Sequence, residues 1–102
     1  MNDTVSSAIV RTPSRFELSV GGHIAFINYT ADNHTANDAA SPRVLAFTHT
    51  EVPHALREGG IGTRLVLGAL DQVRAQGLKV RPLCGFVRHV IARHPDYADL
   101  VV

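Results

Sequence analysis

Apolar and polar residues alternate from Arg15 to Val20, which is the pattern of a strand with one buried face. Gly21 and Gly22 follow, and paired glycines supply the positive φ angles of a two-residue hairpin turn. The return segment, residues 23–29, is apolar at both parities of the alternation. The pattern therefore predicts a hairpin whose second strand is covered on both sides.

Pairing Val20 with His23 sets every other contact in this hairpin. One face then carries two opposed pairs, Leu18 with Ala25 and Phe16 with Ile27. The opposite face receives Ile24 and Phe26, and helices over both faces of the sheet would bury them.

Downstream, residues 44–52 predict a third strand that Pro53 ends, and residues 78–84 predict a short fourth one. Between them lies a helical stripe formed by Ile61, Leu65, Val66, Ala69, Leu70 and Val73. Gly77 stands where a glycine ends a helix, and a second helix begins at Gly85 and ends before Pro95. The order of three strands, a helix, a strand and a helix predicts an α+β or a mixed α/β fold, and α+β is preferred.

The composition limits the alternatives. A chain of 102 residues predicts a single domain, residues 15–102, preceded by a flexible arm over residues 1–14. A net charge of +1 provides no broad electrostatic footprint for nucleic acid or an anionic membrane. No apolar run approaches the roughly 20 residues that span a bilayer. Because Cys84 is the single cysteine and the first residues do not resemble a secretory signal, we expect a cytoplasmic protein. We also expect a monomer or weak dimer.

A glycine-rich turn, residues 57–62, joins the third predicted strand to the first predicted helix. The first turn of a helix has unpaired N–H groups and carries about half a positive charge. No good N-cap side chain precedes Ile61, so phosphate oxygens are suitable partners for these donors. The alternative is an ordinary flexible turn, since the Walker motif is absent and the dinucleotide fingerprint is incomplete.

The spacing in this turn is more specific than its glycines. Arg57-Glu58-Gly59-Gly60-Ile61-Gly62 resembles the Arg/Gln-x-x-Gly-x-Gly/Ala signature of the GCN5-related N-acetyltransferases. The resemblance extends from about Phe16 to Leu100, through residues 49–53, 82–87 and 94–97, and is to the small, minimal members of that superfamily. It implies a mixed, mostly antiparallel sheet with helices on both faces.

The resemblance also implies acetyl-CoA as the co-substrate and a small-molecule or protein amine as the acceptor. The residues expected to hold the pyrophosphate are Arg57, Glu58, Gly59, Gly60, Ile61, Gly62 and Thr63, and the backbone around Val52 is expected to pair with the pantetheine arm. Two features depart from the larger relatives. A carboxylate, Glu58, stands beside the expected pyrophosphate, and the helices that shape the acceptor pocket are replaced by Gly21-Gly22.

Two residues are candidates for the chemistry. Cys84 stands just before a helix N-terminus, where a thiol pKa is lowered, and it would act as a proton donor or an acyl carrier. The alternative is a small buried apolar residue. Glu51 shares one face of its strand with His49, so a base directed toward the acceptor and an exposed pair at a strand end are both consistent with the pattern.

Other residues carry weaker arguments. Tyr97 reaches the thiolate of the leaving group only if the tail folds back, and the six histidines lack the spacing of a metal site, so we expect no metal. The sequence thus predicts an acetyl-CoA-dependent N-acetyltransferase acting by direct attack of the amine. The alternative is a non-catalytic module that binds or senses CoA or acyl-CoA.

Overall fold

The computed structural model describes residues 8–32 and 43–102. The described strands are β1 (Ile9–Arg11), β2 (Arg15–Val20), β3 (His23–Asp32), β4 (Val44–Glu51) and β5 (Lys79–Pro82). The helices are α2 (Ile61–Ala75) and α3 (Gly85–Arg93), with short 3-10 helices η1 (His54–Leu56) and η2 (Pro95–Leu100). The α+β class is confirmed.

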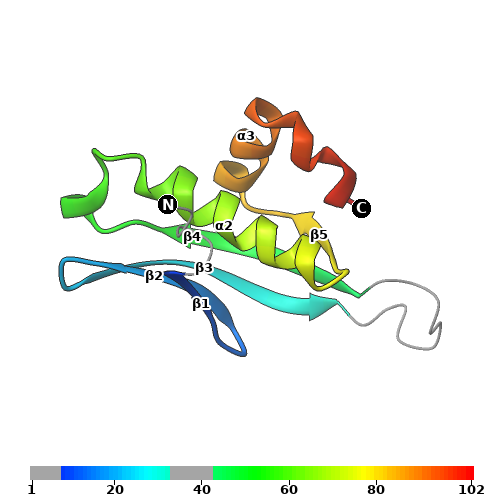
Figure 1. The fold of residues 1–102 in the computed structure, drawn as a ribbon, viewed down its shortest axis with the longest axis horizontal. Helices are drawn as coiled ribbons and strands as arrows, with labels where there is room; N and C mark the ends of the chain where they lie inside the picture. Colours follow the sequence, from blue (N-terminus) through cyan, green and yellow to red (C-terminus); the bar gives the residue numbers. More distant parts are fainter. Residues whose placement is uncertain (1–7, 33–42) are drawn as a thin grey trace.

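The strands form one sheet in the order β1-β2-β3-β4-β5, so neighbours in space follow the order of the chain (Figure 1). Pairing is antiparallel from β1 to β4 and parallel between β4 and β5. The sheet is therefore mixed and mostly antiparallel, as expected. In the hairpin of β2 and β3 the register is the predicted one, with Val20 opposite His23 and Phe16 opposite Ile27.

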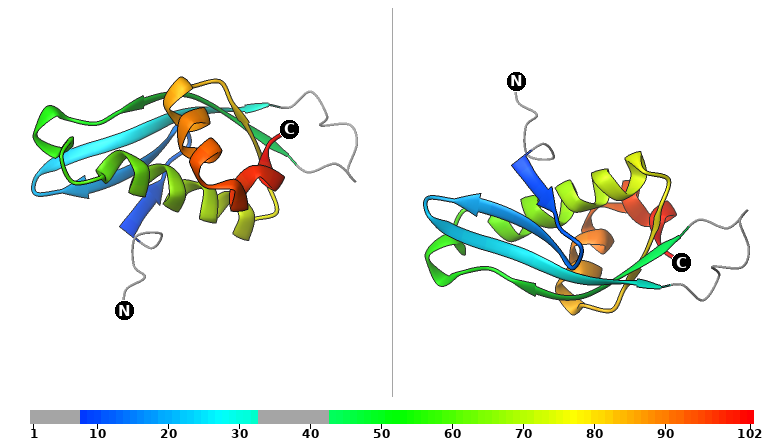
Figure 2. Two further views of the ribbon diagram at one scale, coloured as in Figure 1. Left: turned by 90° about the horizontal axis from the view of Figure 1, so that it is seen from above. Right: turned by 90° about the horizontal axis from the view of Figure 1, so that it is seen from below.

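Both helices pack on the same face of the sheet. One cluster of buried residues joins the inward face of the strands to α2 and α3; it includes Phe16, Ile27, Phe47, Leu65, Val73 and Val87. Figures 1 and 2 show both helices on one side of the strands and no described helix on the other. The expectation of helices on both faces is thus wrong in this detail. Ile24 stays 45% exposed, and Phe26 is covered by the guanidinium of Arg15, 3.8 Å from its ring centroid.

The first strand lies in the segment that was expected to be a flexible arm. β1 pairs with β2, and Ile9 is only 4% exposed. The side-chain amide of Gln72 on α2 donates to the carbonyl oxygen of Ile9 at 2.7 Å. This segment is therefore part of the sheet from Ile9 onward, and Ile9 belongs to the core, while residues 1–7 lie outside the described residues. β3 extends to Asp32, three residues further than predicted. The polar character of residues 30–43 predicts a surface loop, and most of that segment (33–42) is also outside the described residues.

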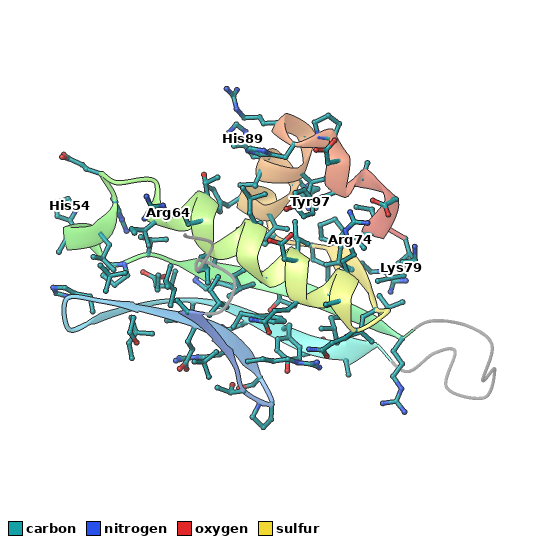
Figure 3. All side chains as sticks on the ribbon, in the orientation of Figure 1. His54, Arg64, Arg74, Lys79, His89 and Tyr97 are labelled. Carbon is teal, nitrogen blue, oxygen red and sulfur yellow. The ribbon has the colours of Figure 1, made fainter. Side chains whose placement is uncertain are left out.

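The C-terminal segment is tied to α2 and β5. The guanidinium of Arg74 donates to both carboxylate oxygens of Asp99, each at 2.9 Å, and the Tyr97 hydroxyl donates to Asp71 at 2.7 Å (Figure 3). The backbone N–H of Val102 donates to Val80 at 3.1 Å. None of the helices in the described residues has the length and apolar character needed to cross a membrane.

Candidate functional site

β4 and β5 run side by side over only part of their length. Their pairing joins Val44–Phe47 to Lys79–Pro82. Where it stops, the N–H groups of Leu83 and Cys84 both donate to the carbonyl oxygen of Phe47, each at 3.0 Å. Beyond this point the chain after β5 turns into α3, while β4 continues alongside β3. Within the described residues β4 therefore has no partner on this side after Phe47, over its last four residues, 48–51.

The loop after β4 leads directly into the N-terminus of α2. Gly60, the residue before the helix, has a φ of 71°, which is strained for any residue with a Cβ. No side chain of the described residues caps this end, and the first turn contains no acidic residue. The first N–H groups of α2 are thus available to an anion from outside the chain.

A cleft of about 400 Å³ opens beside this helix N-terminus. Its lining is Thr50, Glu51, Val52, Arg57, Gly60, Gly62, Thr63 and Phe86. Five of the residues expected to bind CoA line it, Val52, Arg57, Gly60, Gly62 and Thr63. The other three lie around it: Glu58 and Gly59 are exposed, and Ile61 is buried beneath the helix start. Because Glu58 is outside the lining, the unfavourable carboxylate does not face into the cleft.

Gly62 holds three elements close together at the base of the cleft. A Cβ placed there would lie 3.0 Å from the ring of Phe86 on α3 and 3.3 Å from Val52 Cγ2 after β4. A side chain at this position would push α2 away from both neighbours. The second glycine of the signature is therefore explained by close packing, and the first by its left-handed backbone.

Arg57 is already bound within the cleft. Its Nε donates to the carbonyl oxygen of Val52 at 3.0 Å. This is the backbone group that was expected to meet the pantetheine arm. A carbonyl oxygen accepts up to two hydrogen bonds, so Val52 can pair with a ligand either beside the guanidinium or in its place.

Cys84 lies between β5 and α3, next to the part of β4 that β5 does not pair with. Its Sγ is 3.4 Å from Thr50 Oγ1, and the thiol is partly buried before the first turn of α3. Burial on its own raises the pKa of the thiol, but hydrogen bonds from Thr50 and from the backbone of Val87 and Phe86 outweigh it and leave the pKa below its ordinary value. Cys84 does not line the cleft itself, whereas its partner Thr50 does.

Glu51 lies at the end of β4 with His49. His49 Nε2 and Glu51 Oε1 are 3.1 Å apart, and both side chains are about half exposed, at 58% and 48%. The pairs Asn28–His49 and Phe26–Glu51 show that this carboxylate and imidazole stand on the face away from the helices. The arrangement offers a proton acceptor, Glu51, on the open face of β4. It offers a proton donor, Cys84, next to Thr50 on the opposite face of that strand.

Tyr97, the other candidate from the sequence, and Arg88 at the start of α3 are both engaged elsewhere. The Tyr97 hydroxyl donates to Asp71, and burial with this contact raises the pKa of Tyr97 to about 12. Arg88 donates to the carbonyl oxygens of Pro82 and Leu83, at 3.1 and 2.8 Å, so it braces the turn before α3. In the described residues no group of three or more potential metal-ligating side chains occurs.

Phe86 and Thr50 are site residues that sequence reasoning missed. Phe86 received no site role from the sequence, yet it is 38% exposed and lines the cleft. Its position in the first turn, directly after the strand, was the available signal. Thr50 lies on the face of β4 opposite Glu51, and its contact with Cys84 joins residues 34 positions apart and has no local signature.

Comparison with known proteins agrees with this geometry. A family model described as GCN5-related N-acetyl-transferase matches residues 15–100. Among curated proteins, Protein NATD1 of Gallus gallus, Mus musculus and Homo sapiens is 36% identical over 53 residues, 52% of this chain. The matched region covers about half the length of these relatives, 47% or 48%.

Proposed function

The chain belongs to the GCN5-related N-acetyltransferases, and from that membership we propose that it transfers the acetyl group of acetyl-CoA to a primary amine. One observation supports this best: an uncapped helix N-terminus and an unpaired strand end share one cleft. The first suits a pyrophosphate, and the second suits the amide groups of a pantetheine arm. In CoA the pyrophosphate is joined directly to the pantetheine arm, so one molecule carries both groups side by side.

The residues of the cleft fit this co-substrate. The N–H groups from Gly60 to Thr63 would hold the pyrophosphate, and Arg57 would neutralise part of its charge. The backbone of Val52 would pair with the pantetheine arm, either beside the Arg57 guanidinium or after its release. Phe86 and Val52 offer apolar surface to the arm between these two contacts.

The transfer itself needs one proton taken from the amine and one given to sulfur. The neutral amine nitrogen attacks the thioester carbonyl carbon, so a C–N bond forms and the C–S bond breaks. Glu51, assisted by His49, accepts the proton that the nitrogen loses. The electron pair of the C–S bond leaves on the CoA sulfur, and Cys84 supplies the proton that this thiolate takes up. Direct attack needs no acyl-enzyme intermediate.

Two measurements test the proposal. Titration calorimetry with CoA should show binding at one site, and free CoA thiol should be released from acetyl-CoA in the presence of an amine panel. Binding without release for any amine would favour the alternative, a non-catalytic module that binds CoA or acyl-CoA. Absence of CoA binding would contradict both functions.

A further inference from the structure

The cleft beside α2 ends at Thr50. Along β4 and the loop after it, the lining runs from Val52 through Glu51 to Thr50, and it includes none of the earlier residues of this strand, all of which the structure describes. Two residues of an extended strand span roughly 7 Å, so Thr50 lies about that far beyond Val52. Thr50 pairs with the buried Ile27, so its side chain lies on the face of the sheet that the helices cover. This side chain therefore forms the inner end of the cleft.

The turn between β5 and α3 stands behind Thr50. Thr50 Oγ1 is 3.4 Å from Cys84 Sγ. The turn is fastened to β4, because the N–H groups of Leu83 and Cys84 both donate to the carbonyl oxygen of Phe47, each at 3.0 Å. It is also fastened to α3, since the N–H of Arg88 donates to the carbonyl oxygen of Cys84 at 3.1 Å. The contact between Thr50 and Cys84 thus bridges β4 and the turn, and the backbone holds it in place.

The inner end of the cleft is where the proposed donor would carry its acyl group. With the pyrophosphate at the start of α2 and the pantetheine arm beside Val52, the thioester would lie further along β4, toward Thr50. An acetyl group adds only one methyl group beyond the thioester carbonyl. Each further methylene would extend toward the contact between Thr50 and Cys84, and packed side chains admit an added methylene only by moving.

We propose that Thr50, backed by Cys84, is the specificity-determining residue that limits the length of the acyl chain in the donor. The inference rests on the proposed acetyl transfer. Thr50 acts by its size, because its hydroxyl and methyl groups occupy the space into which a third and a fourth acyl carbon would extend. This steric role is separate from the proton donation proposed for Cys84. A site that excludes one methylene discriminates by about tenfold or more, so a four-carbon acyl group should be clearly disfavoured.

Calorimetric titration of the full chain with acetyl-CoA and with butyryl-CoA tests this. The parent chain should bind butyryl-CoA about tenfold or more weakly than acetyl-CoA. Thr50→Ala should remove most of this difference, because it leaves space at the inner end of the cleft. Thr50→Val keeps the size of the side chain and loses only the hydrogen bond to Cys84, so it should keep the difference. Equal affinities in the parent chain, or an undiminished difference in Thr50→Ala, would overturn the proposal. The ratio needs no acceptor, so binding without turnover of any amine would overturn acetyl transfer alone.

Thr63→Ala is the matched control. Thr63 lines the same cleft at its other end, in the first turn of α2. Loss of its side chain should change the affinity for both donors by the same factor, because the two donors differ only in their acyl groups. The ratio of the two affinities should therefore stay as in the parent chain. An equal change of this ratio in Thr63→Ala and Thr50→Ala would show that the acyl chain is not selected at Thr50.

Discussion

The Cys84 thiol lies 3.4 Å from the hydroxyl of Thr50, so its proton affinity depends on a neighbour that carries no charge. Thr50 also lines the cleft, which places this hydrogen bond between the thiol and the proposed co-substrate. A general acid must be protonated to act, so its pKa sets the highest pH at which it works.

Thr50→Val should therefore move the alkaline limit of turnover. The thiol pKa lies below its ordinary value of 9.0 partly because of this bond, and removing the bond raises the pKa. Activity falls as pH rises through that pKa, so the falling limb of the kcat profile shifts to higher pH in the variant. The rate of Cys84 alkylation by iodoacetamide against pH reports the same pKa without turnover.

The control for this prediction is Cys84→Ala, which should slow turnover by about tenfold or more with CoA affinity little changed. If the alkylation profile of Thr50→Val shifts while the falling limb of its kcat profile does not, Cys84 is not the proton donor in the reaction. Acetylated Cys84 in the absence of amine, seen by mass spectrometry, would replace direct attack by an acyl-enzyme route.

Comparing Gly60→Ala with Gly77→Ala should distinguish the effect of Gly60 on CoA binding from its effect on the free energy of unfolding. Gly60 and Gly77 have nearly the same φ, 71° and 70°, at opposite ends of α2, and a Cβ on either meets nothing within 4 Å. Both alanine variants should lose about 1 kcal/mol of unfolding free energy, because both force a left-handed backbone on a residue with a Cβ. Only Gly60→Ala should weaken CoA binding, by about tenfold. Equal CoA affinity in the two variants, measured by calorimetry, would exclude Gly60 from the anion site.

At the scale of elements, η2 is fastened to α2 by groups that titrate. The Tyr97 phenol donates to Asp71, and burial is the main reason why the pKa of Tyr97 rises from 10.0 to about 12. A group whose pKa is higher in the folded state stabilises the fold fully below its unfolded pKa and loses this effect above its folded pKa. The window for Tyr97 is therefore pH 10 to about 12.

In Tyr97→Phe the free energy of unfolding should decrease less with pH in that window than it does in the parent chain. The variant is less stable than the parent near neutral pH, because the hydrogen bond from Tyr97 to Asp71 is lost, and the difference should shrink between pH 10 and about 12. Urea unfolding at a series of pH values measures it, with Tyr29→Phe as the second tyrosine control. A constant difference across the window would show that the Tyr97 hydroxyl does not titrate with folding.

The elements differ in how far the sequence predicts them. The register of β2 and β3 follows from Gly21 and Gly22, since a two-residue turn leaves one pairing that buries Phe16 and Ile27 together. β1 has only three residues and no complete alternation, and the tertiary contact between Gln72 and Ile9 supports it. Contacts of that kind have no local pattern.

The one-sided helices show a different limit. Two apolar residues facing away from the predicted core argued for a second layer, but Arg15 covers Phe26 and Ile24 remains partly exposed. Long polar side chains can cover apolar surface, and a hydrophobicity pattern does not record this. Within the candidate site, the loop 57–63 was predictable from its spacing, whereas Thr50, Phe86 and the bond between Arg57 and Val52 depend on how separate elements pack.

At the scale of the whole molecule, charge is nearly balanced. A net charge of +1 exerts little attraction on a polyanion such as CoA, so attraction has to come from the helix terminus and the groups beside it. Such partly exposed contacts are screened over about 10 Å at 0.1 M salt.

CoA affinity should therefore fall as ionic strength rises, and two adjacent variants should report its source. Arg57→Gln removes a charge that lines the cleft, so it should weaken binding and reduce the salt dependence. Glu58→Gln removes an exposed charge outside the lining and should change affinity by less than about twofold. Calorimetric titrations at several salt concentrations measure both; a clear gain of affinity in Glu58→Gln would place that carboxylate against the pyrophosphate.

The order of the strands also bears on how the chain is made. Because β1 to β4 pair in the order of the chain, this meander can assemble during synthesis, before α2 has left the ribosome. Its inner apolar face, which includes Phe16, Ile27 and Phe47, then stays exposed to solvent until α2 is synthesised and packs against it. β4 is an edge strand at that stage along its whole length, and β5 later closes only half of it. The edge that the proposed co-substrate would occupy is thus the part of a nascent sheet that the finished chain leaves unpaired.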